Sequence, residues 1–147
     1  MAQGILKDIG LFSEKDMIEP DAIADINFFM GDLNFRFNQT YQQHSPNVLN
    51  SAQLIPKLDQ LIQVKREFSV FPGYEENKIT FMPTYKREKN VNAYVNKNNQ
   101  CMSYTDRIMV KNNSNCPLVI QEYGCHENYW GSDHRPVFSH VRVLTQP

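Results

Sequence analysis

The sequence lacks an excess of charge of either sign. Its 147 residues include 15 Lys and Arg against 16 Asp and Glu, which gives a formal net charge of -1 and a pI near 6.4. Proteins that bind nucleic acid usually carry a clear basic excess, so we expect no nucleic-acid partner. No apolar run approaches the roughly 18 residues of a membrane-spanning helix. The first eight residues also lack the pattern of a secretion signal, and we therefore expect a cytoplasmic protein.

Cysteine is scarce as well. The three cysteines, Cys101, Cys116 and Cys125, are odd in number and share no C-x-x-C spacing, so we expect no disulfide framework. Cys116 and Cys125 lie near His126 and His134, but the paired short spacings of a structural zinc site are missing. The length suffices for one domain with a buried core.

Short apolar runs and one helical stretch are what the sequence does contain. Strands are predicted over residues 26–30, 78–81, 106–110, 117–121 and 135–143. Residues 47–67 carry leucines at three- and four-residue steps, which is typical of a helix. Pro56 should interrupt it and open a second helix. This order predicts a layered α/β or α+β domain, while residues 1–25 form an N-terminal segment without an assigned element.

Polar residues gather at the ends of the predicted strands. They occupy four segments, at 31–36, 83–86, 105–107 and 132–136. Since each segment adjoins an apolar run, we expect all four to point from a rigid scaffold into one cleft. Together they supply the Asp, Asn, His and Lys side chains that cut a phosphate ester with a metal-activated water.

Each of these segments also has an ordinary structural interpretation. Asp32 and Asn34 would share one side of an extended segment, but they also fit an Asx turn that follows a strand. Asp106 could accept a hydrogen bond from an imidazole, whereas Asp106 and Arg107 also fit a surface ion pair. The basic residues of 86–89 fit a solvated face. The sequence leaves these alternatives open.

Five segments occur in an order that characterises a known family. Residues 29–36 read FMGDLNFR and residues 102–109 read MSYTDRIM; residues 58–61, 79–86 and 132–137 read LDQL, ITFMPTYK and SDHRPV. They are similar to the W-x-G-D-x-N-[FY]-R, P-[AS]-W-x-D-R-[IV]-L, D-Q-L, P-T-Y-K and S-D-H-K-P-V elements of the inositol polyphosphate 5-phosphatases. This family belongs to the endonuclease/exonuclease/phosphatase superfamily, which the chain thus resembles.

The resemblance implies a fold and its extent. Residues 26–147 would form roughly the C-terminal half of a deoxyribonuclease-I-like four-layer α/β sandwich. In the family, the preceding half supplies the Asn and Glu of the magnesium site, and Met1–Asp25 offers no equivalent. We therefore expect the chain to hold part of an active site, so that the activity of this chain alone would be low.

The resemblance also implies catalytic roles. Asp32 would orient and deprotonate the attacking water, and Asn34 would donate a hydrogen bond to the phosphoryl oxygens. His134, held by Asp106, would stabilise the charge that develops on the phosphate. Asp133 would belong to the shell of a Mg²⁺ ion, a hard cation that binds few carboxylates together with substrate phosphate and water.

Substrate-binding roles follow from the same resemblance. Tyr85 and Lys86 would hold the neighbouring 4-phosphate of the inositol ring. Arg107 and Lys97 are the further cations that we expect at the substrate. Two positions that are usually basic in the family are uncharged here, with Lys97 one step away, so recognition of the 4-phosphate would be weaker or achieved differently.

The implied reaction is magnesium-dependent hydrolysis of the 5-phosphate of phosphoinositide lipids or soluble inositol polyphosphates, with peripheral contact with membranes. One alternative is a catalytically inactive remnant that binds lipid headgroups or a partner protein. Another is a metal-dependent nuclease, which the neutral charge and the P-T-Y-K element disfavour. Half of a sandwich would expose an apolar sheet face, which predicts self-association.

Overall fold

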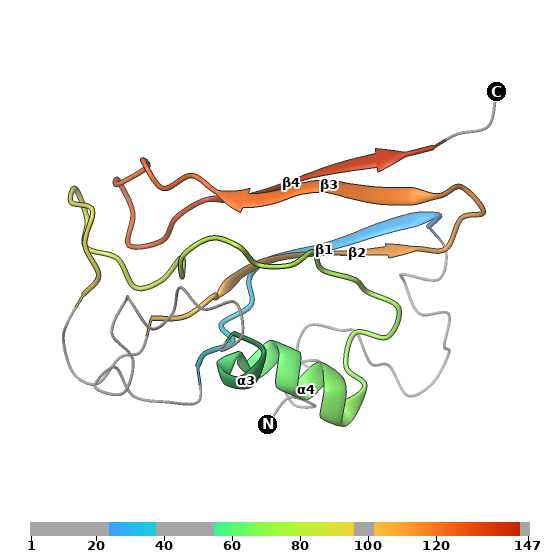
Figure 1. Ribbon diagram of the computed structural model, residues 1–147, viewed down its shortest axis with the longest axis horizontal. Helices are drawn as coiled ribbons and strands as arrows, with labels where there is room; N and C mark the ends of the chain where they lie inside the picture. The colour runs from blue at the N-terminus through green and yellow to red at the C-terminus, as the bar shows by residue number, and fades with distance from the viewer. Residues whose placement is uncertain (1–23, 38–54, 96–101, 145–147) are drawn as a thin grey trace.

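The computed structural model describes residues 24–37, 55–95 and 102–144 (Figure 1). Within these ranges, four strands and two helices form. The strands are β1 (Ile26–Asp32), β2 (Asp106–Asn112), β3 (Leu118–Cys125) and β4 (Val137–Val143). The helices are α3 (Ile55–Leu58) and α4 (Gln60–Phe68). No helix of the described ranges is long and apolar enough to cross a membrane.

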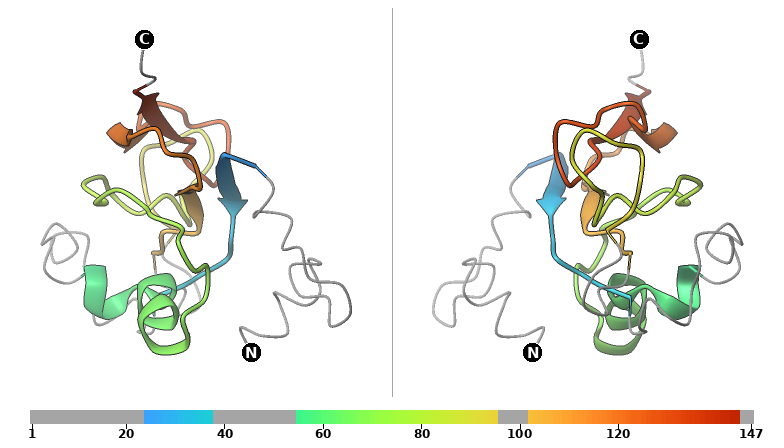
Figure 2. Two further views of the ribbon diagram at one scale, coloured as in Figure 1. Left: turned by 90° about the vertical axis from the view of Figure 1, so that its right-hand side faces the viewer. Right: turned by 90° about the vertical axis from the view of Figure 1, so that its left-hand side faces the viewer.

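The elements stack in three layers. β1 pairs antiparallel with β2, and β3 pairs antiparallel with β4. The two sheets lie over one another, with β2 contacting β4, and the helices lie on the other side of the β1–β2 sheet (Figures 1 and 2). This arrangement of helix, sheet and sheet confirms the expected α/β class and is consistent with part of a deoxyribonuclease-I-like sandwich.

Helix α4 begins where its sequence provides a cap. Asp59 has extended backbone angles, and its side chain accepts a hydrogen bond from the Ile62 amide at 3.0 Å. Leu61 is completely buried beneath the β1–β2 sheet, and the helix ends at Ser69, whose φ of 51° is left-handed. The interruption of the predicted helix therefore lies at Asp59, and Pro56 stands in the first turn of α3. Residues 47–54 lie outside the described ranges.

The predicted strand over residues 78–81 is wrong. The segment pairs with no strand among the described residues, and two of its backbone groups bond to side chains instead. The Lys78 amide donates to Asn77 Oδ1 at 2.8 Å, and the Phe81 carbonyl accepts from the Tyr104 hydroxyl at 2.7 Å. Ile79 is buried in the core. The other four predicted strands are confirmed, with ends shifted by at most four residues.

Two clusters of buried side chains hold the layers together. One joins the segment after β1 to α3, to the segment before β2 and to β3. The other lies between α4 and the β1–β2 sheet. The first consists of Phe37, Leu58, Ile79, Met102, Tyr104 and Tyr123, and the second of Leu61, Val70, Phe71 and Met109. Because both clusters reach the end of the β1–β2 sheet where β1 stops, they provide a rigid base for the polar residues there.

Candidate active site

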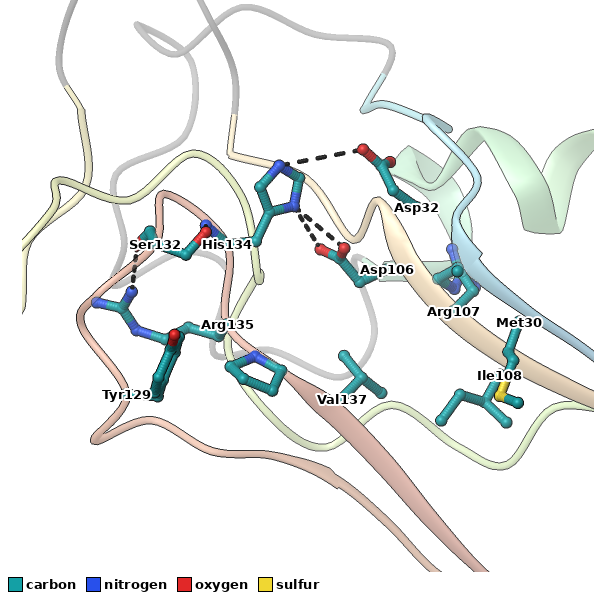
Figure 3. Close-up of a pocket in the computed structure, with 12 residues that line it drawn as sticks. Met30, Asp32, Asp106, Arg107, Ile108, Tyr129, Ser132, His134, Arg135 and Val137 are labelled. Carbon is teal, nitrogen blue, oxygen red and sulfur yellow. Dashed lines mark hydrogen bonds and ion pairs between the residues drawn. The ribbon is translucent and has the colours of Figure 1, made fainter.

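The pairing of β1 with β2 brings two carboxylates side by side. Asp32, the last residue of β1, is the register partner of Asp106, the first residue of β2. Directly opposed like charges destabilise a sheet, so a polar partner between them is favourable. His134 occupies that place, on the loop that precedes β4 (Figure 3). Its Nδ1 lies 3.0 and 3.1 Å from the two Asp106 oxygens, and its Nε2 lies 4.0 Å from Asp32 Oδ2.

These three side chains open into a cleft between the sheets. The cleft has a volume of about 470 Å³. Its polar end contains Asp32, Asp106, Ser132 and His134, and its apolar end contains Met30, Ile108 and Val137 (Figure 3). The side chains of Asp32 and His134 are 43% and 28% exposed, so solvent reaches both. The segments at 31–36, 105–107 and 132–136 therefore converge as the sequence predicts.

Two threonines fix the Asp106 carboxylate. The Thr84 hydroxyl donates to Asp106 Oδ2 at 2.6 Å, and the Thr105 hydroxyl donates to the same oxygen at 2.9 Å. Both threonines are completely buried. A carboxylate held in this way can in turn hold the His134 ring in one orientation, since it accepts the Nδ1 proton. Sequence reasoning missed both residues; their position beside Tyr85 and Asp106 in the recognised segments was the available signal.

The loop after β1 contains the Asx turn that the sequence left open. The Asn34 amide donates to Asp32 Oδ1 at 3.0 Å, and Asn34 has a left-handed φ of 57°. Leu33 packs against the second core cluster, while Asp32 and Asn34 are exposed. The turn and the candidate catalytic pair thus coexist, because the turn uses only one carboxylate oxygen and leaves Oδ2 facing His134.

Tyr85 covers the other side of the histidine. Its ring lies 4.5 Å from the His134 ring, with an angle of 35° between the planes. The Arg36 guanidinium lies 4.5 Å above the Tyr85 ring, and Lys86 Nζ lies 5.8 Å from it. Two cations therefore lie near the ring that contacts the candidate histidine, which is a suitable environment for a phosphate group. Sequence reasoning did not include Arg36 among the site residues.

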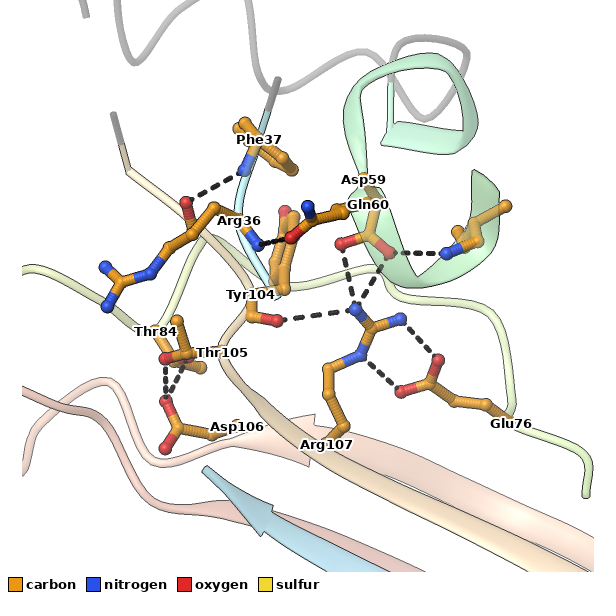
Figure 4. Close-up of polar contacts among 12 residues, drawn as sticks. Arg36, Phe37, Asp59, Gln60, Glu76, Thr84, Tyr104, Thr105, Asp106 and Arg107 are labelled. Carbon is orange, nitrogen blue, oxygen red and sulfur yellow. Dashed lines mark hydrogen bonds and ion pairs between the residues drawn. The ribbon is translucent and has the colours of Figure 1, made fainter. Parts of the chain in front are cut away.

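Arg107 corrects an expectation. Its guanidinium does not face the cleft but is buried between two carboxylates on the helix side of the sheet (Figure 4). Nη1 lies 2.8 and 2.9 Å from the Asp59 oxygens, while Nε and Nη2 lie 2.7 and 2.5 Å from Glu76. Burial lowers the pKa of Arg107, but hydrogen bonds to Glu76 and the charge of Asp59 outweigh it, so the pKa is raised overall. Arg107 is part of the framework.

The D-Q-L segment has the same framework role. Asp59 caps α4 and pairs with Arg107, and Leu61 fills the core. Gln60 holds the backbone of Arg36 at both ends, since Gln60 Oε1 accepts from the Arg36 amide at 3.2 Å and the Gln60 amide donates to the Arg36 carbonyl at 3.0 Å. This short segment therefore links the helix to the loop that carries Asp32 and Asn34.

Asp133, unlike its neighbours Ser132 and His134, does not line the cleft. Asp133 is half-buried, and its carbonyl accepts from the Arg87 amide at 2.9 Å. Lys97 lies outside the described residues. In the described ranges, no group of three or more His, Cys, Asp and Glu side chains could hold a metal ion. The described part of the chain thus contains no preformed cage of three such ligands for a metal.

Comparison with known proteins identifies the family. The family described as Endonuclease/Exonuclease/phosphatase family 2 matches residues 1–140. The chain is 32% identical over 127 residues to phosphatidylinositol polyphosphate 5-phosphatase type IV of Rattus norvegicus, which covers 82% of the chain and 19% of that protein. It is also 32% identical over 130 residues to Nitrophorin Cim l NP of Cimex lectularius, which covers 87% of the chain and 42% of that protein.

Solved structures give the same result. The inositol polyphosphate 5-phosphatase domain of synaptojanin, in complex with inositol (1,4)-bisphosphate and a calcium ion, matches with a TM-score of 0.67 and 29% identity over 82% of this chain and 36% of that one. The Cimex nitrophorin ferrous NO complex matches with a TM-score of 0.74 and 29% identity over 88% and 45%. The chain spans less than half of each of these proteins. It belongs to the inositol polyphosphate 5-phosphatase family of the endonuclease/exonuclease/phosphatase superfamily.

Proposed function

We propose that this chain carries the water-activating and phosphate-binding residues of a magnesium-dependent phosphatase. The substrate would be the 5-phosphate of a phosphoinositide lipid or a soluble inositol polyphosphate. The observation that carries the proposal is the position of His134, which lies between Asp106 and Asp32 at the polar end of the cleft. The named 5-phosphatases among the relatives support the class of substrate.

The two carboxylates have different surroundings and therefore different proposed roles. Asp106 is tied by Thr84, Thr105 and His134, so it acts as a fixed anchor for the imidazole. Asp32 is more exposed and has one oxygen outside the turn, so it can orient a water and accept its proton. His134, held by Asp106, would donate to the phosphoryl oxygens and stabilise the charge that develops on them.

The neighbouring cations would select the substrate. Tyr85 lies against the His134 ring and Lys86 Nζ lies 5.8 Å from the Tyr85 ring, so both would hold a second phosphate on the same inositol ring. Asn34 would donate to the phosphoryl oxygens. Lys97 remains a proposed contact, whereas Arg107 is withdrawn from this set because its guanidinium is consumed by Asp59 and Glu76.

Magnesium is proposed on the chemistry of the donors. Mg²⁺ binds one or two carboxylates and completes its shell with water and substrate phosphate, so the single carboxylate of Asp133 on the His134 loop is compatible with it. When bound, the ion would neutralise charge on the phosphoryl group. We expect chelation with EDTA to abolish phosphate release and Mg²⁺ to restore it; release that persists after chelation would exclude the metal.

The test is phosphate release by the intact chain. With Mg²⁺ and a 5-phosphorylated inositol polyphosphate, Asp32→Asn should lower the rate by about 10²- to 10⁴-fold, since it removes a general base. Asp25→Asn is the matched control, because Asp25 is also exposed, immediately precedes the same strand and uses only its backbone carbonyl to bind Asn113 and Ser114. Absence of release from the unmodified chain would overturn the proposal.

A non-catalytic binding protein is the second candidate. One relative of comparable identity is named as a nitrophorin rather than as a phosphatase, and its solved structure is a ferrous NO complex. The family fold is therefore found in proteins with different names and ligands. Saturable binding of the inositol polyphosphate or of vesicles that contain phosphoinositide, without any phosphate release, would favour this candidate over the enzyme.

A further inference from the structure

We infer that Arg36 is a positioning residue, which sets the orientation of the Asn34 amide and of the Tyr85 ring for binding of a phosphoryl group. The inference deepens the proposed function and rests on it for its kinetic consequences. It rests on geometry alone for the orientation of the two side chains. Arg36 makes one contact with each of them, from a backbone that is itself anchored.

Hydrogen bonds to Gln60 fix the backbone of Arg36. Its amide donates to Gln60 Oε1 at 3.2 Å, and its carbonyl accepts from the Gln60 amide at 3.0 Å. Gln60 is the first residue of α4, and the next residue, Leu61, is completely buried. Phe37, which follows Arg36, is buried, and its amide donates to the Ser103 hydroxyl at 3.1 Å. The side chain of Arg36 thus extends from a stable point (Figure 4), and its guanidinium reaches the Tyr85 ring.

The first contact determines which end of the Asn34 amide is available. Arg36 Nη2 donates to Asn34 Oδ1 at 2.5 Å. Rotation of the amide by 180° would place its NH₂ group against the guanidinium, and two donors would then face each other. Arg36 therefore holds the carbonyl oxygen of Asn34 on its own side and directs the NH₂ group away from itself. The NH₂ group is the end that a phosphoryl oxygen requires.

The second contact connects Arg36 to the histidine. Its guanidinium lies 4.5 Å from the centre of the Tyr85 ring, and the same ring lies 4.5 Å from the His134 ring. A flat guanidinium can cover an aromatic face, whereas an ammonium group is a compact point charge. The Tyr85 ring thus contacts both Arg36 and His134. Since Arg36 also binds the Asn34 amide, one residue connects the loop after β1 to the ring beside the histidine.

Two substitutions separate the contacts. Arg36→Gln removes the positive charge and the stacking plane. Arg36→Lys keeps a charged donor for Asn34 but lacks the flat face for Tyr85. Arg66→Gln is the matched control, because Arg66 is an exposed α4 residue whose side chain reaches only Glu67, at 3.4 Å. All three changes leave the buried clusters of the core intact.

The direct test observes the Asn34 side-chain amide by NMR. In ¹H–¹⁵N spectra of the intact chain, the Asn34 side-chain NH₂ signals are assigned by their loss in Asn34→Asp, and inorganic phosphate or an inositol polyphosphate is then added. We expect Arg36→Gln to move these signals before any ligand is added and to reduce their response to the ligand. Arg66→Gln should leave both unchanged, and Arg36→Lys should preserve more of the response than Arg36→Gln.

The kinetic test separates positioning from simple attraction. A positioning role predicts that Arg36→Gln lowers kcat by about tenfold to a hundredfold, as misplaced groups commonly do, with a smaller change in KM. A change confined to KM would instead show that Arg36 only attracts the anionic substrate, and would overturn the inference. Asn34 signals that are unaffected by Arg36→Gln would overturn it as well.

The two proposals fail in different ways. If the unmodified chain releases no phosphate, the proposal of phosphatase activity is overturned. The NH₂ signals of Asn34 still decide whether Arg36 orients that amide, because they need no turnover. A folded Arg36→Gln variant is recognised by backbone signals that match those of the parent chain outside residues 32–37 and 84–86.

Discussion

Single residues around the cleft divide into those that face solvent and those that hold the scaffold. Arg107 illustrates the second kind, because its charge is balanced by Asp59 and Glu76 while the hydroxyl of Tyr123 donates to Glu76 at 2.6 Å. The cluster links β2 to α4, to the segment that contains Glu76 and to β3. Buried charges are tolerated only in such complete sets, since removal of one member leaves another unpaired.

Removal of Arg107 should therefore destabilise the fold. We expect Arg107→Ala to lower the free energy of unfolding by about 3–5 kcal/mol, because Asp59 and Glu76 would be left without their cation. Arg142→Ala, at an exposed position on β4, is the control and should change it by less than about 0.5 kcal/mol. Urea unfolding followed by circular dichroism measures both. Equal stability of the two variants would argue that the cluster contributes nothing.

Buried hydroxyl and thiol groups predict sensitivity to alkaline pH. Burial, with hydrogen bonding and charge from Glu127, raises the pKa of the Cys125 thiol to about 12, against 9.0 for an ordinary cysteine. Burial likewise raises the pKa values of Tyr94, Tyr104 and Tyr123 above the ordinary 10.0. These groups ionise first in the unfolded chain. Their stabilising contribution is thus complete below pH 9 and is lost as the pH rises toward 12.

Thermal unfolding at pH 8 and at pH 10.5 tests this contribution. The melting temperature should be lower at pH 10.5, and tyrosinate absorbance from the three buried tyrosines should appear together with unfolding rather than before it. Cys125→Ala should make the decrease in melting temperature between pH 8 and pH 10.5 smaller. A fully ionised set of tyrosines in a protein that is still folded would contradict the burial on which the prediction depends.

Among the larger elements, two loops act as one unit beside the cleft. The segment that carries Tyr85 and Lys86 and the segment that carries His134 are joined through their backbones. The Asn90 amide donates to the Trp130 carbonyl at 2.7 Å, and the Arg135 amide donates to the Thr84 carbonyl at 3.0 Å. Side chains add to this connection.

Arg87 is the centre of the side-chain connection. It is buried, it pairs with Glu127 on the second loop, and its guanidinium lies 4.1 Å above the Tyr94 ring. The Arg135 guanidinium donates to the carbonyls of Ser132 at 3.2 Å and of Val91 at 3.4 Å. The loops can therefore move relative to one another only if buried polar groups lose their partners.

Loss of the carboxylate at Glu127 should loosen both loops. We expect Glu127→Gln to lower the free energy of unfolding by about 1–2 kcal/mol, since Glu127 is partly exposed and the full cost of a broken buried pair does not apply. Hydrogen exchange at the Asn90 and Arg87 amides should become faster. Glu122→Gln, at an exposed carboxylate that pairs with His140, is the control. Unchanged exchange at both amides would show that the backbone bonds suffice.

For the molecule as a whole, the packing of the two sheets leaves one apolar region uncovered. Phe28 and Met30 lie on the face of β1 that continues into the cleft, and they are 50% and 65% exposed. Large apolar side chains grouped on a strand at the edge of the described sheet promote contact with another chain. Because the face is formed by neighbouring residues of one strand, a second copy can cover it by the same surface.

We expect self-association through this face. Sedimentation velocity should show a concentration-dependent dimer for the parent chain and a monomer for a Phe28→Ser, Met30→Ser double variant. Val119→Ser is the control, since Val119 is 47% exposed but lies on the other sheet, and it should not change the dimer. A parent chain that sediments as a monomer at all concentrations would contradict the prediction.

Local sequence determined most of the elements. Short apolar runs, with alternation in the last of them, located four of the five predicted strands, and Asp59 as the cap with Leu61 in the core determined where α4 begins. The alternation also placed Asp32 and Asn34 on the exposed side of the loop. These features depend on neighbouring residues, so a sequence records them directly. The prediction of a strand at 78–81 is wrong because a segment forms a strand only where another strand lies beside it. Which segments lie side by side is decided by the tertiary structure.

The roles of the charged side chains were decided only by the tertiary structure. Asp106 and Arg107 are adjacent in sequence, yet one enters the cleft and the other lies between Asp59 and Glu76, because successive residues of a strand face opposite sides of the sheet. Which side holds the helix and which holds His134 follows from how β1, β2 and β4 pack. The sequence by itself determined the family and the chemical groups; packing decided which of those groups reach a substrate and which hold the scaffold.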